Sequence, residues 1–428
     1  MLSAFRNAFK IPDLRGKILF TLAIIAVYRL GSHLPVPGVD FKAVHDFLNS
    51  AGAQNNNAFT LINLFSGGAL TQFAIFALGI MPYITSSIIM QLLGVVIPRL
   101  EQLQKEGETG RKRIQQITRY VTVALAVLQS AGIVTLAHSK QLLPGVDIFP
   151  GLDWQRFALA VLTLSAGTAL IMWLGELITQ RGVGNGMSIL IFSAIVARLP
   201  SEGASILRVN KAFIFGLVMV LGLLIIVAVI FVEQAQRRIP VQYAKRMVGR
   251  RMYGGQSTYI PLKVNQAGVI PIIFASSLLY LPQLLASIVH QQWLTDLSDR
   301  FTRTGNHPAY IIAYFVLIIL FAYFYNSIAF NPVDTADNMR KYGGFIPGIR
   351  PGRPTAEYLD HILTRITLPG AMFLAAVAIL PFIALSAGNI QQFPFGGTAI
   401  LITVGVGLET MKQIESQLLM RNYEGFLR

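Results

Sequence analysis

The stretch "ALGIMPYITSSII", residues 77–89, lies in an apolar run long enough to cross a membrane, yet it contains Gly79 and Pro82. Proline removes a helical hydrogen bond and crowds the preceding turn, and glycine adds backbone freedom. The same spacing returns in "AGVIPIIFASSLL", residues 267–279, whose proline lies 189 residues further on (271 − 82). The two stretches predict two membrane helices that are interrupted at matching points.

The composition is that of a membrane protein. Of the 428 residues, 54% are hydrophobic and 13% are charged, about half the charged fraction of a soluble protein. Apolar runs of about 20 residues, the length that spans a bilayer, recur along the chain. The chain has no cysteine and six scattered histidines, so we expect neither a disulfide nor a bound metal or other cofactor.

Ten apolar ranges predict an all-α integral membrane protein with ten transmembrane helices. Four basic residues precede the first range without a cleavage site behind it, which indicates an uncleaved first span. An even number of spans places both termini on one side, and about three quarters of the 35 lysines and arginines fall on that side, which the positive-inside rule makes cytoplasmic. The predicted spans are 18–34, 72–97, 115–137, 155–178, 184–200, 212–232, 267–290, 309–330, 367–388 and 397–416.

Ten spans divide into an N-terminal half, residues 1–200, and a C-terminal half, residues 201–428. Halves with an odd number of spans have opposite orientations, so any repeat between them is inverted. The shared glycine–proline spacing falls on the second span of each half, which favours such a repeat. Chance is the alternative, because both residues are common in membrane helices.

The apolar segment "FTLINLFSGGAL", residues 59–70, is too short to span a membrane: as a helix it reaches roughly 18 Å. A re-entrant half-helix and an amphipathic helix on the outer surface are both consistent with it. If the segment re-enters the membrane, it must do so in a cavity or against protein, because non-helical backbone is not tolerated in lipid.

No catalytic motif is present, so the sequence predicts that the protein is not an enzyme. The middles of the spans are also nearly free of charge: Glu176, Glu233 and Glu409 lie near cytoplasmic ends, and Arg29 lies near the outer end of the first span. A secondary transporter built from inverted repeats is the alternative function. It is disfavoured because ion-coupled transport needs an ionisable group near the midplane.

Aliphatic side chains fill the middles of several spans. Pairs of them have the i, i+4 spacing of one helix face. Ordinary packing explains such residues one at a time, whereas together they are also suited to a hydrophobic constriction that closes a pore by excluding water. The candidate residues are Ile80, Ile84, Met187, Ile191, Ile273 and Ile402.

Two long basic loops, residues 234–266 and 331–366, are predicted to be cytoplasmic. Positive-inside bias and contact with anionic lipids explain their charge. Their length and their many Gly and Pro turns favour docking surfaces for a large partner, including one rich in phosphate.

Long motifs over nearly the whole chain resemble the SecY family of protein-translocase channels. They are "NLFSGGAL" (63–70), "IFALGIMPYITSSIIMQLL" (75–93), "MWLGELITQRGVGNGMSI" (172–189), "QRRIPVQYAK" (236–245), "QSTYIPLKVNQAGVIPIIFASS" (256–277), "GGFIPGIRPG" (343–352) and "FGGTAILI" (395–402).

The resemblance implies a SecY-like channel of two inverted five-helix halves in the bacterial plasma membrane. Unfolded, signal-bearing polypeptides pass through its central pore, and membrane segments leave sideways into lipid. The six aliphatic residues match the family's pore ring, although Met187 stands where isoleucine is more usual. The segment 60–70 resembles the family's re-entrant plug, with Asn63, Leu64, Phe65, Ser66, Gly67 and Gly68 at its end.

The resemblance also implies a lateral gate and docking sites. Spans 2, 3, 7 and 8 form the gate, with Thr85 and Leu281 on facing helices. Arg250, Arg251 and Arg350 match residues that engage the ribosome and the SecA motor. Expected partners are SecE and SecG, SecA, the ribosome, signal peptides and nascent chains, and anionic lipids.

Overall fold

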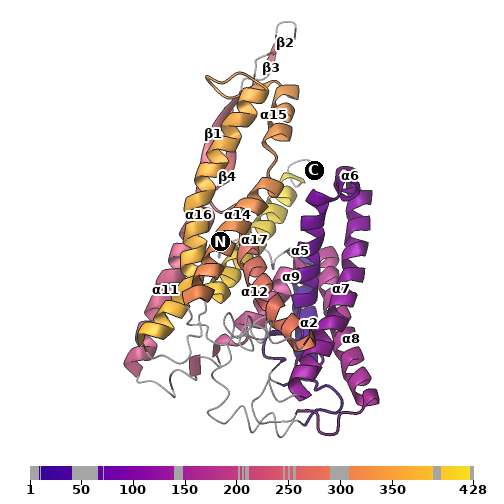
Figure 1. Cartoon of the computed structure of the whole chain (residues 1–428). Coiled ribbons are helices and arrows are strands. Elements are labelled where there is room, and N and C mark those ends of the chain that lie inside the picture. The colour runs from indigo at the N-terminus through magenta and orange to yellow at the C-terminus, as the bar shows by residue number, and fades with distance from the viewer. Residues whose placement is uncertain are drawn as a thin grey trace.

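The structure is a computed structural model, and helices make up most of it (Figure 1). The residues that it describes are 9, 11–40, 66–70, 72–138, 148–200, 203–204, 207, 212–243, 246–248, 251–253, 257–289, 308–388 and 397–424.

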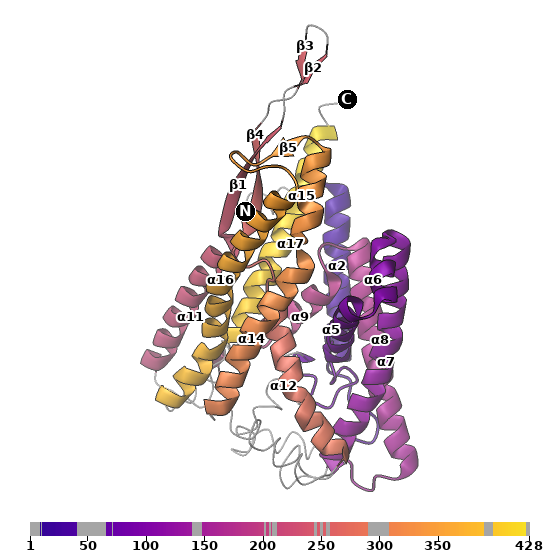
Figure 2. The same cartoon turned by 45° about the horizontal axis from the view of Figure 1, so that its top comes forward.

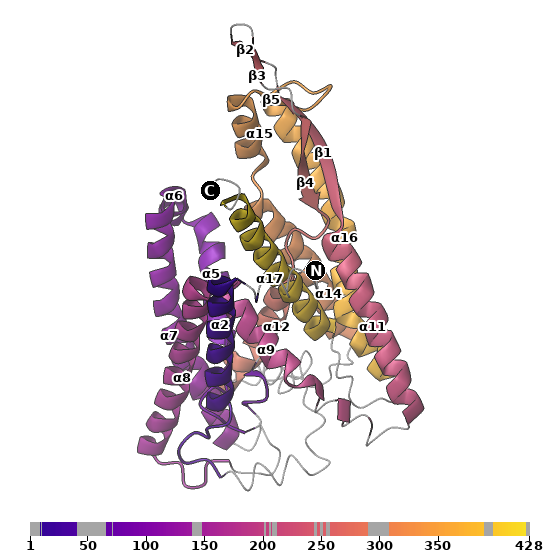
Figure 3. The same cartoon turned by 180° about the vertical axis from the view of Figure 1, so that it is seen from behind.

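The helices gather in two groups that follow the chain (Figures 1 and 3). The groups meet where α12 packs against α5 and α7, and where α17 packs against α9. The first group holds α2 (Pro12–Gly31), α5 (Met81–Val96), α6 (Pro98–Lys105), α7 (Glu108–His138), α8 (Trp154–Arg181) and α9 (Gly186–Val196). The second holds α11 (Ala212–Gln234), α12 (Ile270–Val289), α14 (Pro308–Ala329), α15 (Pro332–Lys341), α16 (Arg353–Gly388) and α17 (Gly397–Glu424).

Each predicted span overlaps one of these helices. Among the described residues, five helices are long and apolar enough to cross a membrane, or six if α5 and the bent helix α6 count as one span. Two further apolar helices are shorter in the described part of the chain, α9 with 11 residues and α12 over Ile270–Leu279. The chain is therefore a multi-pass helical protein, while the count of ten spans stays a prediction.

The prediction of a helix over 72–97 is wrong for residues 72–80, because α5 begins only at Met81. The preceding residues form turns, and their backbone pairs with the segment that follows α2. The N–H of Ile75 donates to the carbonyl of Leu34 at 2.8 Å, and that of Val36 donates to Phe73 at 2.8 Å. These bonds satisfy buried peptide groups that a helix would otherwise satisfy.

The glycine–proline pairs start helices and do not interrupt them, contrary to the prediction. Gly79 has a φ of +57° and Gly268 a φ of +59°, a left-handed conformation that favours glycine. Two residues after each glycine a helix begins, α5 at Met81 and α12 at Ile270. Each proline is the second residue of its helix, where its missing N–H costs no hydrogen bond. The two halves therefore share a local structure at positions that the sequence match had aligned.

The two basic loops fold together outside the helical bundle (Figure 2). Their strands are β1 (Gln236–Tyr243), β2 (Arg246–Val248), β3 (Arg251–Tyr253), β4 (Ser257–Lys263) and β5 (Gly344–Phe345). Strand β1 pairs antiparallel with both β4 and β5, and β2 pairs with β3 in a hairpin at the far end. We call strands β1–β4, α15 and residues 344–363, which include β5, the projecting unit. Its own apolar core is Ile239, Val241, Leu262, Met339, Ile346, Leu359 and Leu363.

The contact between α8 and α9 gives a test of the packing. An alanine at Gly186 would overlap the carbonyl oxygen of Gly175 and bring its methyl group 2.8 Å from Ile178 Cβ. We expect Gly186→Ala to destabilise the protein by about 1–3 kcal/mol, as overpacking usually does. Gly407→Ala is the control, because a methyl group there meets nothing within 4 Å and alanine favours the helix. Thermal unfolding in detergent measures both variants, and equal melting temperatures would contradict the α8–α9 contact.

Candidate channel constriction and its surroundings

The six aliphatic candidates, which we call the waist cluster, come together in the structure. Five of them are buried members of one apolar core, and Ile84 packs against it. The six come from α5, α9, α12 and α17, or the residue just before α5, so both groups of helices contribute. Ile84 also packs against the neighbouring core formed largely by α12, α14 and α16.

The waist cluster lies where four helices begin. Ile80 is the N-cap residue of α5. Met187 is the second residue of α9, and its N–H donates to the side chain of Asn185, the N-cap residue, at 3.2 Å. Ile273 and Ile402 lie in the first two turns of α12 and α17. Figure 3 shows α9 and α12 between the two groups of helices.

The end of the predicted plug borders this core. Asn63, Leu64 and Phe65 lie outside the described residues. Ser66 is fully buried, and its hydroxyl accepts from the Leu70 N–H at 3.3 Å. Ala69, three residues on, belongs to the same apolar core as the waist cluster. The described end of the segment is therefore inside the protein and does not lie on an outer surface.

The helices expected to form the lateral gate adjoin one another. α12 packs against α14 on one side and against α5 and α7 on the other (Figure 2). Thr85 is buried in α5, and its hydroxyl donates to the Met81 carbonyl at 2.9 Å. Leu281 lies within α12, but its side chain is outside the described part of the chain. The two groups of helices therefore contact each other along α5 and the described part of α12.

Glu176, which the sequence placed near a cytoplasmic end, binds a partner that the sequence did not indicate. Arg119 in α7 donates to it through two nitrogens, at 2.8 and 2.6 Å, and Gln115 donates at 3.2 Å. This pair joins α7 to α8. A carboxylate held by a bidentate arginine is satisfied in place, which does not suit a transport site.

Two of the three docking candidates, Arg251 and Arg350, lie on the projecting unit. Arg251 begins β3 in the terminal hairpin, and Arg250 lies outside the described residues. Arg350 is exposed between β5 and α16, and its carbonyl accepts from the Thr355 hydroxyl at 2.9 Å. Because β5 pairs with β1, two loops that are far apart in sequence present one surface.

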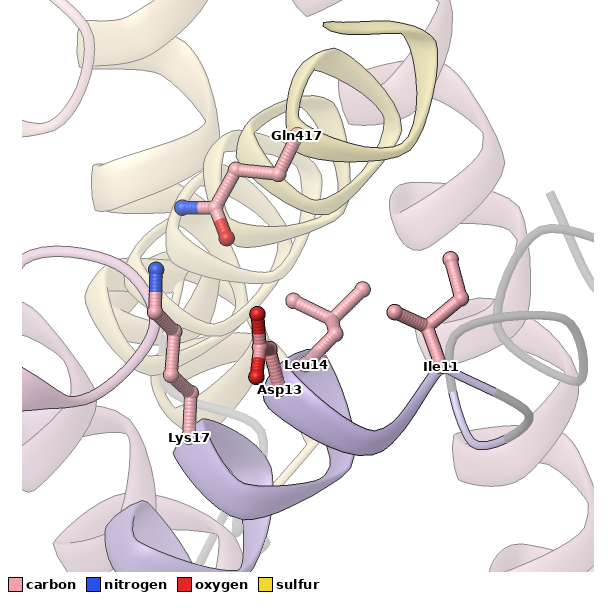
Figure 4. A pocket seen from close by; sticks show the side chains of 5 residues that line it. All are labelled: Ile11, Asp13, Leu14, Lys17 and Gln417. Carbon is pink, nitrogen blue, oxygen red and sulfur yellow. The ribbon is translucent and has the colours of Figure 1, made fainter. Parts of the chain in front are cut away.

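A pocket lies between α2 and α17, away from the waist cluster. Figure 4 shows that Gln417 comes from α17 and the other lining residues from the start of α2. The lining mixes apolar and charged side chains: Ile11, Asp13, Leu14, Lys17 and Gln417. Nothing in this lining forms a catalytic arrangement.

Known proteins resemble this chain in sequence and in fold. The family model for SecY matches residues 74–411. The protein translocase subunit SecY of Streptomyces galbus is 59% identical over 439 residues, which cover 100% of both chains.

Two solved structures share the fold. One is described as a protein-conducting channel, with a TM-score of 0.64, 18% identity and 96% of each chain covered. The other is Sec61 in the canine ribosome–channel complex, with a TM-score of 0.61, 17% identity and 96% of each chain covered. The similarity in sequence and in fold identifies the chain as a member of the SecY family, the channel-forming subunit of the protein translocase and not an enzyme.

Proposed function

We propose that the waist cluster is the constriction through which this translocase subunit passes unfolded, signal-bearing polypeptides. The observation that supports it is the convergence of six aliphatic side chains from both groups of helices in one apolar core. A ring without polar groups offers water no partner, so an empty channel is closed by dewetting. A translocating chain can separate such side chains because no directional bond joins them.

The segment 60–70 acts as the plug in this proposal. The burial of Ser66 and the place of Ala69 in the core of the waist cluster support contact between plug and constriction. Residues 1–200 and 201–428 act as the two halves, and α5, α7, α12 and α14 act as the lateral gate. Opening then requires α12 to separate from α5 and α7.

The proposal also covers the membrane in which the protein lies and the partners that it binds. The chain lies in a bacterial plasma membrane with both termini in the cytoplasm, as the charge distribution supports. SecE and SecG are its small subunits, and signal peptides and nascent chains enter its channel. The projecting unit binds the ribosome and the SecA motor, and the remaining basic surface contacts anionic lipids.

The seal can be tested by placing polar groups in it. Ile84→Asn and Ile273→Asn together should turn a silent channel into one that flickers open, because water gains hydrogen-bonding partners at the constriction. The measurement is single-channel conductance of the purified translocase in planar bilayers. Ile272→Asn is the matched control: Ile272 directly precedes Ile273 in α12 and is fully buried, but it packs in the neighbouring core. Silence in the double variant, or an equal leak in the control, would refute the assigned constriction.

The lateral gate can be locked. Cysteines at positions 85 and 281 of this cysteine-free chain should form a disulfide that blocks export of signal-bearing proteins, with recovery on reduction. Each single cysteine is the control. Export that continues through the cross-linked protein would contradict the gate, and a defect in small-solute uptake with normal export would favour a transporter.

The docking surface predicts a salt effect. Arg250→Glu with Arg251→Glu should weaken ribosome binding and reduce the slope of log affinity against log salt by about one for each lost phosphate contact. Arg350→Glu should reduce motor-driven export more than insertion of the channel itself. Arg156→Glu serves as control, because this exposed arginine lies at the start of α8, in the other group of helices. If ribosome binding and export are unchanged in all variants, the docking role is contradicted. The loop arginines then serve only to orient the chain in the membrane.

A further inference from the structure

Arg29 is a charged residue near the end of α2 that the constriction does not use. It is half-buried in a predicted span, only two residues from the helix end at Gly31. A charge in this setting is costly, and such residues usually have a functional role and pair with other charges or with backbone carbonyls. Its contacts therefore indicate what it does.

The guanidinium of Arg29 joins two segments far apart in the chain. One terminal nitrogen, NH1, donates to the Gly67 carbonyl at 3.1 Å, at the end of the plug segment. The other, NH2, donates to the Ser193 carbonyl at 2.9 Å and the Ala194 carbonyl at 3.4 Å. Ser193 and Ala194 lie in the last turn of α9, the negative end of the helix dipole.

Tyr28, the residue before Arg29, donates to the same part of the plug. Its hydroxyl lies 3.4 Å from the Ser66 carbonyl, and its side chain is fully buried. Its ring stacks on Phe76 with centroids 5.7 Å apart, which fixes the direction of the hydroxyl. Two consecutive residues of α2 therefore hold two consecutive carbonyls of the plug.

Gly67 shows how closely the plug approaches α9. Its φ is +66°, and a Cβ built on it would lie 2.9 Å from both the Cα and the Cβ of Ala194. No larger residue fits without moving one of the two segments. The close approach of the two segments therefore requires glycine at position 67 of the plug. It also brings the plug beside the α9 carbonyls that bind Arg29.

We infer that Tyr28 and Arg29 form a polar latch that holds the end of the plug against α9 in the closed channel. This inference rests on the proposed role of segment 60–70 as the plug. Leaving the closed position breaks the bonds to Ser66 and Gly67 but not those from Arg29 to α9. The charge therefore keeps hydrogen-bond partners when the plug moves, and the latch can close again.

The test measures how often the plug leaves its site. Ser66→Cys places a single, fully buried thiol at the latch, and a membrane-impermeant maleimide reports its exposure. Arg29→Gln should speed labelling of this thiol about tenfold, the factor expected for losing one charge-assisted hydrogen bond. Tyr28→Phe should have a smaller effect in the same direction, and Arg29→Lys should restore much of the slow rate.

Matched controls separate a latch from general loosening of the fold. A cysteine at Ser165, buried in α8, should label equally slowly with and without Arg29→Gln. Arg156→Gln removes another arginine that donates to two backbone carbonyls, Pro150 and Gly151, and should leave position 66 unchanged. Gly67→Ala should speed labelling more than Gly68→Ala; both glycines have positive φ, but an added methyl group at Gly68 meets nothing within 4 Å.

The outcomes for the latch and for the plug can be told apart. Unchanged labelling at position 66 in Arg29→Gln, or equal acceleration at positions 66 and 165, overturns the latch. Deletion of residues 60–70 tests the plug separately through conductance. If that deletion leaks while Arg29→Gln does not change labelling, the plug stands and the latch fails. If Arg29→Gln speeds labelling only at position 66 while the deletion stays silent, the latch stands as a contact and the plug function fails.

Discussion

The constraint behind this structure is that peptide groups inside a membrane protein need hydrogen-bond partners even where helices start. Several helices start in the apolar interior, and at α5, α9 and α12 the described residues show how the start is accommodated locally. Pro82 and Pro271 occupy positions where an N–H would have no partner. At α9 the side chain of Thr179 accepts from the Gly186 N–H at 2.9 Å, beside the Asn185 cap. Because these starts need no water, aliphatic residues can gather around them, and the waist cluster results.

The sequence predicted the helices well and their starts poorly. Apolar runs locate the spans because burial in lipid requires them. Residues 72–80 are as apolar as a membrane helix, but their backbone pairs with residues 34–36, and no local pattern shows this pairing. The sequence gives a weak indication of the strands in the projecting unit, because the apolar Ile239 and Val241 alternate with polar or exposed neighbours in β1. The pairing of β1 with β5 depends on residues about a hundred positions apart and could not be read from either loop.

The sequence likewise predicted some features of the candidate site and not others. The i, i+4 pairs at the start of α5 and within α9 follow from helical periodicity. The meeting of four helices came from the family resemblance and not from the residues. The sequence showed Arg29 as an isolated charge in a span, and such a charge is costly unless it has a hydrogen-bonding or charged partner. Its partners are backbone carbonyls, which every residue carries, so the sequence could not identify them.

The projecting unit and the helical bundle share one continuous element. Helix α16 has 36 residues and is about 54 Å long, well beyond the thickness of a bilayer. Its first part holds Leu359 and Leu363 in the core of the projecting unit, and its later part packs beside α14 and α17. The strands proposed as a docking surface therefore pack on a helix whose later part belongs to the second core, where α12 also packs. The proposed docking surface and the channel helices are thus joined by one helix and not by a loop.

Met187 shows which property of the proposed constriction is constrained. In the structure it lies against Gly175 of α8, where an added Cβ would come 2.5 Å from the methionine sulfur. The missing side chain at Gly175 makes room for a long, flexible one at Met187. Apolar exchanges that conserve volume are tolerated in cores, and the thioether adds only a weak acceptor. A seal that works by excluding water requires apolar groups and a narrow width, so a neighbouring glycine can compensate for a change of shape but not for a change of polarity.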